Sequence, residues 1–270
     1  IDRLVNEGRT RYFVAQRIAQ VKRIFKWAAS EELIPFEAYQ RLTTIEAPRK
    51  GKTKAKECPP VVPVEDDAIE ATLPHLPQIV ADMVRLQRYT GARPGEICQL
   101  RPADVDRSTD VWRYVPQEHK TMDRGKARVI LIGPKAQIVL APYLLRDAES
   151  YCFNPTDSEK NRRIEQSERR VTPIVYGNRP GTNRKRRPKR RAGYRYQIAS
   201  YRRAIARAAK EAGVGSWSPN QLRHAAATEL RRVFGIEAAQ VVLGHSELST
   251  TQIYAERNIE KAAEIMAKLG

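Results

Sequence analysis

The chain has 270 residues, of which 41% are hydrophobic and 30% charged, so it can bury a core and is not disordered by composition. It holds 49 lysine and arginine residues against 31 aspartate and glutamate residues, and its net charge of +18 favours a polyanionic partner, nucleic acid before an anionic membrane. No apolar run reaches the ~18 residues that span a bilayer, which excludes a transmembrane protein. The scattered cysteines Cys58, Cys98 and Cys152 exclude a disulfide scaffold and offer no metal-ligand spacing.

The first 45 residues are predicted to be helical. Over residues 11–29, apolar residues recur at the spacing of one helix face: Val14, Ile18, Val21, Phe25 and Ala28. Three basic residues lie off that stripe and are candidate DNA contacts: Lys22, Arg23 and Lys26. A shorter helix is expected over residues 31–44. Two helices bury too little for a robust domain, and the chain begins with Ile1 rather than Met, so we expect 1–45 to continue a module that starts upstream.

Residues 46–63 are predicted to be a linker, because they hold four prolines, five lysine or arginine residues and no apolar periodicity. Such a segment suits a chain that wraps around a polyanion. It equally suits a solvated flexible tether, and the two interpretations are compatible.

The rest of the chain is predicted to be mainly α with a small antiparallel β-sheet. A helix that contains Ile79, Met83 and Leu86 should end at Gly91. Residues 111–115 and 128–132 read as paired strands, with Lys120–Lys126 at their turn. Three further helices are expected: one over 198–212, one from the Ser218-Pro219 cap to Gly235, and one over 237–243.

Residues 146–195 form a polar, charged insert. Seven of the eight residues over 184–191 are basic: Arg184, Lys185, Arg186, Arg187, Lys189, Arg190 and Arg191. Such a run cannot pack internally, so we expect a loop or arm. It suits phosphate binding in a protein this basic, although a solvated charge run is the alternative.

Four short segments carry the candidate chemistry. Arg93 stands where Pro94-Gly95 open a short helix, so its guanidinium can join a helix N-terminus in holding an anion. Lys120 lies in the predicted hairpin turn and can donate a proton or bind a phosphate. Each signal is weak alone, because arginines after turns and lysines in hairpins are usually solvated.

The other two segments follow in SPNQLRH and LGHSELSTTQIYAE. Asn220 and Arg223 are i, i+3 neighbours on a predicted helix and can converge on one anion. His224 is predicted to be a buried histidine rather than a phosphate ligand. Gly244 should end a helix and leave His245 at a turn, and Tyr254 follows nine residues later. Alone, Tyr254 would read as a partly buried aromatic residue.

In combination these segments resemble the tyrosine recombinase family, the phage-type integrases. The order TGxRxGE, hairpin lysine, xxLRH and LGHxxxxxTxxY matches that family over about residues 85–256. The stretch RIFKWAASEELIP also resembles the end of the family's core-binding domain. The resemblance implies a tyrosine-recombinase-like catalytic domain over 64–270, preceded by the last part of a helical, DNA-clamping core-binding domain over 1–45.

The resemblance also implies a reaction and its residues. A tyrosine hydroxyl attacks the scissile phosphodiester of double-stranded DNA and forms a 3′-phosphotyrosyl link, so no high-energy cofactor or metal is expected. Carried over by motif, the roles are Tyr254 as nucleophile, Arg93 and Arg223 as phosphate clamps, Lys120 as general acid, His245 as a phosphate or tyrosine partner, and Glu96 as the residue that orients Arg93.

One position departs from the family pattern. A histidine is usual three residues before the second arginine, and here that residue is Asn220. Asparagine can donate a hydrogen bond to phosphate but cannot exchange a proton near neutral pH. Either Asn220 serves as a neutral donor while His245 or water takes the tyrosine proton, or the enzyme is slow.

The resemblance extends to partners. An apolar stripe follows the tyrosine: Ile259, Ala262, Ala263, Met266 and Leu269. In the family such tail helices dock on a neighbouring protomer in a tetrameric synapse, and packing within one chain is the alternative. The family implies a bacterial, cytoplasmic, DNA-associated protein, with no membrane partner, that serves a mobile element.

Three other functions compete with a site-specific recombinase. A type IB topoisomerase shares the tyrosine and arginine chemistry, but the core-binding segment and the LGHxxxxxTxxY pattern favour a recombinase. A catalytically silent DNA-binding regulator with the same fold is kept open by Asn220. A basic RNA-binding protein is the weakest alternative, because no RNA-recognition motif is present.

Overall fold

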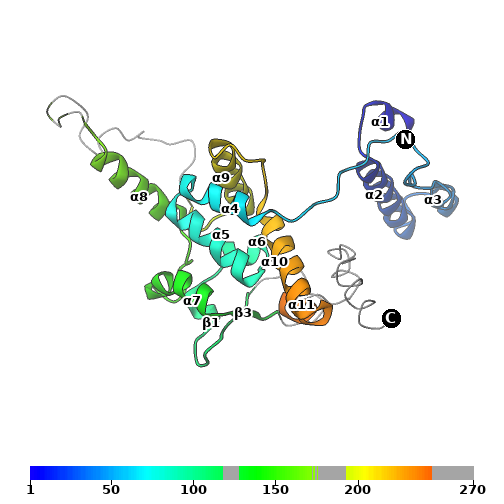
Figure 1. Cartoon of the computed structure of the whole chain (residues 1–270). Helices are drawn as coiled ribbons and strands as arrows, with labels where there is room; N and C mark the ends of the chain where they lie inside the picture. Colours follow the sequence, from blue (N-terminus) through cyan, green and yellow to red (C-terminus); the bar gives the residue numbers. More distant parts are fainter. Residues whose placement is uncertain (118–127, 172, 174, 176–192, 245–270) are drawn as a thin grey trace, which may run out of the picture. The chain divides into compact units, whose positions relative to one another are not determined.

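The computed structural model describes residues 1–117, 128–171, 173, 175 and 193–244 (Figure 1). The chain divides into two units, residues 1–61 and 62–270. The division falls within the last residues of the predicted linker. Each unit is described by itself below.

The first unit contains α1 (Asp2–Asn6), α2 (Arg11–Ser30) and α3 (Phe36–Thr43). The helix predicted over 11–29 is confirmed as α2, and the Thr10 hydroxyl caps it by accepting a hydrogen bond from the Phe13 amide at 3.3 Å. Within α2 only Val14 is fully buried, so most of the predicted apolar stripe is partly or fully exposed in this unit. The five-residue α1 was not predicted from the sequence.

The segment 46–63 contains no helix or strand. Its middle part nevertheless packs against the start of α2 within the first unit, because Thr10 forms a parallel β-bridge with Lys56 and Arg11 forms an ion pair with Glu57. Part of the predicted linker therefore lies against the first residues of α2.

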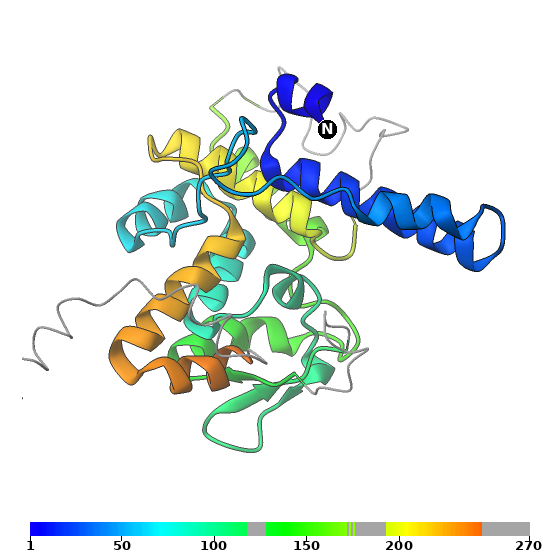
Figure 2. The same cartoon turned by 90° about the vertical axis from the view of Figure 1, so that its right-hand side faces the viewer.

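Helix α5 lies centrally in the second unit and packs against α7 and α10 (Figures 1 and 2). Buried Met83, Val84 and Leu86 of α5 belong to the main hydrophobic core of the chain. Among the described residues of this unit, the helices, short 3-10 helices included, are α4 (Asp66–Thr72), η1 (Leu73–His75), α5 (Gln78–Thr90), α6 (Pro94–Cys98), η2 (Pro102–Asp104), α7 (Pro134–Leu140), η4 (Ala141–Leu145), α8 (Pro155–Glu168), α9 (Ile198–Glu211), α10 (Pro219–Phe234) and α11 (Ile236–Leu243).

A three-stranded antiparallel sheet completes the second unit, with the order β1 (Val105–Asp106), β2 (Trp112–Tyr114), β3 (Ile130–Ile132). Tyr114 pairs with Ile130 and Trp112 with Ile132. Along β3 burial alternates, since Ile130 and Ile132 are buried and Leu131 is exposed, as expected for a sheet with one face on the core. The two predicted strands and their antiparallel pairing are confirmed, whereas the two-residue β1 was not predicted.

The polar insert contains a helix, α8, that the sequence did not predict. None of its residues is buried, so no apolar periodicity marks it. Asn154 caps it by accepting from the Thr156 amide at 2.8 Å, Pro155 occupies its first position, and Glu159 pairs with Arg162 and Arg163. Figure 1 shows α8 extending away from the other helices of the unit.

Across the described parts of the chain, no helix is both long enough and apolar enough to cross a membrane.

Candidate active site

Arg93 is the N-cap of α6, where the Pro94-Gly95 signal predicted a helix start. One oxygen of the Glu96 carboxylate accepts from the Arg93 amide at 2.7 Å, and the other accepts from Nη1 of the Arg93 side chain at 2.9 Å. The Arg93 side chain is 28% exposed and that of Glu96 only 3%. Glu96 therefore holds Arg93 from the buried side and leaves part of the Arg93 side chain exposed.

Arg223 lies one turn into α10 and is buried. Its Nη1 donates to the main-chain carbonyl of Gly91 at 2.7 Å, and its Nη2 donates to that of Leu243 at 2.8 Å. Gly91 ends α5 in the left-handed conformation, with φ of 62°. Arg223 thus joins the turn that leads to Arg93 with the last turn of α11.

Gln87 is a residue of this frame that the sequence did not point to. It is fully buried in α5, its amide nitrogen donates to the carbonyls of Ala92 and Pro219 at 3.1 and 2.9 Å, and its amide oxygen accepts from the Tyr201 hydroxyl at 3.0 Å. One side chain therefore links α5 and α9 to the residue before Arg93 and to the residue before Asn220. These hydrogen bonds offset the cost of burying the polar amide.

Arg128 is the second residue that the sequence did not single out, beyond placing it at the start of a strand. Its side chain is 4% exposed, and its Nε donates at 3.3 Å to the same Glu96 oxygen that binds the Arg93 side chain. Burial lowers the pKa of Arg128, and Glu96 opposes that effect. For Glu96, burial raises the pKa, but Arg128, Arg93 and the Arg93 amide together bring it below its ordinary value. The three groups form an Arg–Glu–Arg cluster, in which Glu96 and Arg128 are buried and Arg93 is partly exposed.

Asn220 is exposed in the first turn of α10, one turn before Arg223, and His224 is buried behind it. The Asn220 amide nitrogen lies 3.1 Å from Nε2 of His224. Burial lowers the pKa of His224 and the neighbouring Arg223 lowers it further, which favours a neutral imidazole. A neutral ring can accept from Asn220, so His224 orients the asparagine amide.

The structure therefore brings five predicted residues together: Arg93, Glu96, Asn220, Arg223 and His224. The predicted roles of Lys120, His245 and Tyr254 fall on residues outside the described part of the chain, as do the basic run 184–191 and the apolar tail stripe. In the first unit Arg23 and Lys26 are exposed, whereas the Lys22 ammonium binds the carbonyls of Thr43 and Ile45 at 3.1 and 2.6 Å. Lys22 therefore stabilises the end of α3.

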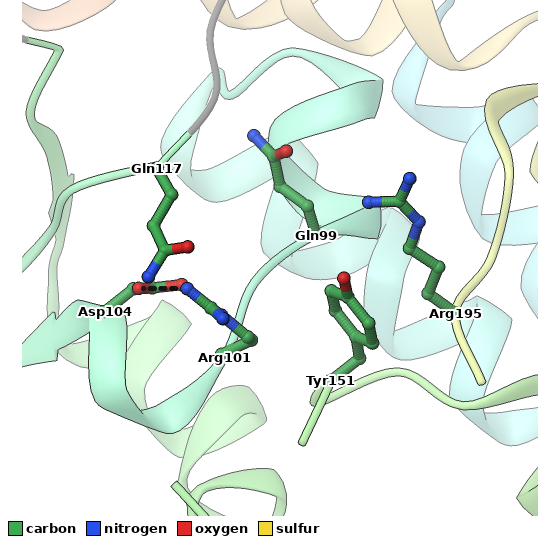
Figure 3. Close-up of a pocket in the computed structure, with 6 residues that line it drawn as sticks. All are labelled: Gln99, Arg101, Asp104, Gln117, Tyr151 and Arg195. Carbon is green, nitrogen blue, oxygen red and sulfur yellow. Dashed lines mark hydrogen bonds and ion pairs between the residues drawn. The ribbon is translucent and has the colours of Figure 1, made fainter. Parts of the chain in front are cut away.

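A small polar hollow lies at the opposite end of α6 from Arg93 (Figure 3). Its volume of about 60 Å³ has room for a few water molecules and none for a nucleotide. Arg101 binds both oxygens of Asp104 at 3.0 Å, and the Arg195 guanidinium stacks 5.5 Å from the ring centre of Tyr151. The Arg101–Asp104 pair stabilises the turn from α6 into η2. Among the residues that the structure describes, no group of three or more His, Cys, Asp or Glu side chains could hold a metal ion.

Comparison with known proteins identifies the class to which this fold belongs, the DNA-cleaving and rejoining tyrosine recombinases. The family model described as "Phage integrase family" matches residues 68–261, and the chain belongs to this family. The predicted fold class, family and enzyme class are thereby confirmed.

Relatives and solved structures agree with that assignment. The tyrosine recombinase XerC of Corynebacterium efficiens is 28% identical over 98% of this chain and 73% of its own length. The XerC of a Roseiflexus species is 26% identical over 93% of this chain and 70% of its own. The fold is similar to that of a lambda integrase dimer bound to a COC′ core site (TM-score 0.64, 15% identity, covering 95% of this chain and 77% of that one). It is also similar to the Tn1549 transposon integrase in complex with circular intermediate DNA (TM-score 0.60, 17% identity, covering 98% and 81%).

Proposed function

We propose that this protein is a site-specific DNA recombinase that cuts and rejoins strands through a 3′-phosphotyrosyl intermediate, and that it serves a mobile element. The observation that carries the proposal is the hydrogen bond from Arg223 to Gly91, which ties the second arginine to the turn that presents Arg93. Two guanidiniums held on one frame suit a single phosphate.

In the proposed reaction, the Tyr254 hydroxyl attacks the scissile phosphorus and loses its proton. The bond from phosphorus to the 5′-oxygen breaks, and Lys120 gives that oxygen a proton. The 5′-hydroxyl of a partner strand then attacks the phosphotyrosyl link and releases Tyr254. The bond energy is retained throughout, so this sequence of steps needs no high-energy cofactor.

The arginines act on the transition state. A pentavalent phosphorane carries more negative charge than the diester, so fixed cations bind it more tightly than the ground state. Losing one such donor typically costs about 10²–10³ in rate. A phenol of pKa ~10 is a poor nucleophile at neutral pH, and two nearby guanidiniums favour its ionised form.

Asn220 takes a neutral role in this proposal. Its amide nitrogen lies 3.1 Å from Nε2 of His224, so the side chain is held at the surface of the site. There the second amide N–H can donate a hydrogen bond to a phosphate oxygen. His245 or water then accepts the tyrosine proton, because Asn220 cannot.

The proposed partner is double-stranded DNA, bound by a homo-oligomer that assembles as a tetrameric synapse. The unit of residues 1–61 would supply the end of a DNA clamp through Arg23 and Lys26, the unit of residues 62–270 would carry the chemistry, and the basic run 184–191 would bind phosphates. The tail stripe over 259–269 would dock on a neighbouring protomer. Such a protein acts where bacterial DNA is, in the cytoplasm.

A catalytically silent DNA-binding regulator is the second candidate. It is favoured by Asn220 alone, since the usual proton-exchanging histidine is absent there. The Arg–Glu–Arg cluster opposes it, because a regulator has no use for a buried group that orients one arginine.

The test is covalent trapping. A nicked suicide substrate made from the element's own ends is incubated with wild type and with Tyr254→Phe, and the products are run on a denaturing gel. A protein–DNA band in wild type only supports the recombinase. Specific, salt-sensitive binding with no band in either protein supports the regulator.

A further inference from the structure

Arg128 is a buried arginine that no step of the proposed reaction uses. It lies two residues before β3, and a long charged side chain beside a strand is usually solvated, yet it is 4% exposed. Taking a guanidinium out of water is costly unless its partners compensate. The contacts of Arg128 must therefore compensate the cost of burying its charge.

One side of Arg128 faces Glu96. Its Nε and the Nη1 of Arg93 both donate to Oε1 of that carboxylate, at 3.3 and 2.9 Å. The position of Glu96 is thus set from two directions, and Glu96 in turn fixes both the backbone and the side chain of Arg93. A displacement of Arg128 therefore displaces Arg93 as well, because both side chains donate to Oε1 of Glu96.

The other side of Arg128 faces the end of α11. Its Nη1 lies 3.5 Å from the carbonyl of Val242 and 3.4 Å from that of Val129, at the long end of the hydrogen-bond range. The guanidinium packs against Gly244, and a Cβ atom at Gly244 would collide with it. Gly244 ends α11 in the left-handed conformation, with φ of 63°.

Two arginines therefore meet the last turn of α11. Arg128 approaches the carbonyl of Val242, and Arg223 binds that of Leu243 at 2.8 Å. The last carbonyls of a helix have no partner within the helix and carry its partial negative charge, so cations there stabilise it. The chain leaves this turn at Gly244, directly before His245 and ten residues before Tyr254.

We propose that Arg128 is a positioning residue for DNA cleavage: it fixes the orientation of Arg93, through Glu96, relative to the point where the chain leaves α11 toward His245 and Tyr254. This inference rests on the proposed function and deepens it. One buried guanidinium then fixes the position of the phosphate clamp relative to the end of α11.

Stability alone does not account for this arginine. Its Nη2 is buried and has no hydrogen-bond partner within the described residues, and an unpaired buried donor is destabilising. Replacing a buried ion pair by apolar side chains is often neutral or stabilising. A residue kept only for the core would not need this charge.

The first experiment needs no activity. Hydrogen–deuterium exchange is measured on peptides from residues 236–244 in wild type, Arg128→Met and the control Arg101→Met, which removes an arginine paired with Asp104 and Glu149 elsewhere in the same unit. We expect severalfold faster exchange at the end of α11 in Arg128→Met only. Unchanged exchange there would overturn the inference, whether or not the protein cleaves DNA.

The second experiment measures single-turnover cleavage and DNA affinity separately. Arg128→Met should slow cleavage by about ten- to a hundredfold, as misplacing a catalytic group does, with affinity unchanged. In a double-mutant cycle, Arg128→Met in an Arg93→Ala background should lower the cleavage rate little further, because Arg128 acts through Arg93. Multiplicative effects would contradict a role through Arg93, whereas no cleavage by wild type would contradict the proposed function instead.

A conservative variant covers the case in which Arg128→Met does not fold. Arg128→Lys keeps the charge beside Glu96 but loses the planar fork that also reaches α11. We expect a folded protein that still cleaves slowly. Cleavage by Arg128→Lys at the wild-type rate would show that charge alone suffices and would overturn the positioning role.

Discussion

The guanidinium of Arg223 donates to the main-chain carbonyl of Gly91 at 2.7 Å, so the second predicted phosphate ligand holds the turn that presents the first. The two arginines are 130 positions apart in the sequence, from 93 to 223. Their relative position therefore depends on the packing of α5, α10 and α11 around this turn. Substitutions that disturb the packing should impair cleavage without touching either side chain.

Gly91→Ala tests that packing. A Cβ atom there would lie 2.5 Å from Cδ2 of Leu243, a fully buried side chain, and the residue would also keep φ of 62°. We expect about 1–3 kcal/mol from the overpacking, in addition to about 1 kcal/mol from the left-handed backbone. The matched control is Gly213→Ala, where φ is 71° and no atom lies within 4 Å. Urea unfolding of the two variants should differ by the overpacking cost, and equal losses would contradict close packing at Gly91.

Glu96→Gln removes the negative charge from the Arg–Glu–Arg cluster and leaves Arg128 without its ionic partner. Breaking a buried pair in this way typically costs about 3–5 kcal/mol in free energy of unfolding. The control is Glu149→Gln, whose side chain is 69% exposed in its pair with Arg101 and should change stability by less than about 1 kcal/mol. Denaturant titrations measure both, and a Glu96→Gln protein as stable as the control would show that the cluster contributes little.

The same carboxylate predicts a pH dependence. The pKa of Glu96 is below its ordinary 4.5 in the folded protein, because Arg128 and Arg93 outweigh the effect of burial. The folded state then favours the ionised form, so its stabilisation is complete above about pH 4.5 and is lost as the pH falls through the folded-state pKa. The stability difference between wild type and Glu96→Gln should shrink on acidification across that window. A difference that grows on acidification would mean the pKa is raised instead.

The local signals in the sequence predicted the structure well. Gly91, the Pro94-Gly95 start of α6 and the Ser218-Pro219 start of α10 are each set by nearest neighbours, and they place Arg93 and Arg223 where the structure has them. Gln87 and Arg128 were missed, because the burial of a polar residue depends on partners far along the chain, such as Pro219 and Val242. α8 was missed because it has no buried face.

Asn220→His restores the residue type usual in the family. We expect cleavage to be retained, because histidine can also donate a hydrogen bond to phosphate. Asn220→Ala is the contrasting variant, and it should slow cleavage by about 10²-fold if the amide is a transition-state donor. Single-turnover rates at neutral pH give the comparison. Complete loss of cleavage in a folded Asn220→His protein would contradict the neutral-donor role.

DNA affinity should fall steeply with salt, since binding to phosphates releases counterions. Replacing the seven basic residues of 184–191 with glutamine should flatten the plot of log affinity against log salt by about 0.9 for each phosphate that is no longer neutralised. Replacing Arg162, which is paired with Glu159 on exposed α8, is the control and should leave the slope unchanged. Fluorescence anisotropy across a salt series measures the slopes. An identical slope after all seven replacements would mean that the run does not touch DNA.

The most direct test of the proposed reaction is to map the covalent adduct. The trapped protein–DNA complex is digested with protease and nuclease, and the modified peptide is sequenced by mass spectrometry. We predict a nucleotide joined through its 3′-phosphate to Tyr254, and no adduct in Tyr254→Phe. An adduct on another residue, or one joined through a 5′-phosphate, would contradict the central claim that Tyr254 is the nucleophile of a 3′-phosphotyrosyl recombinase.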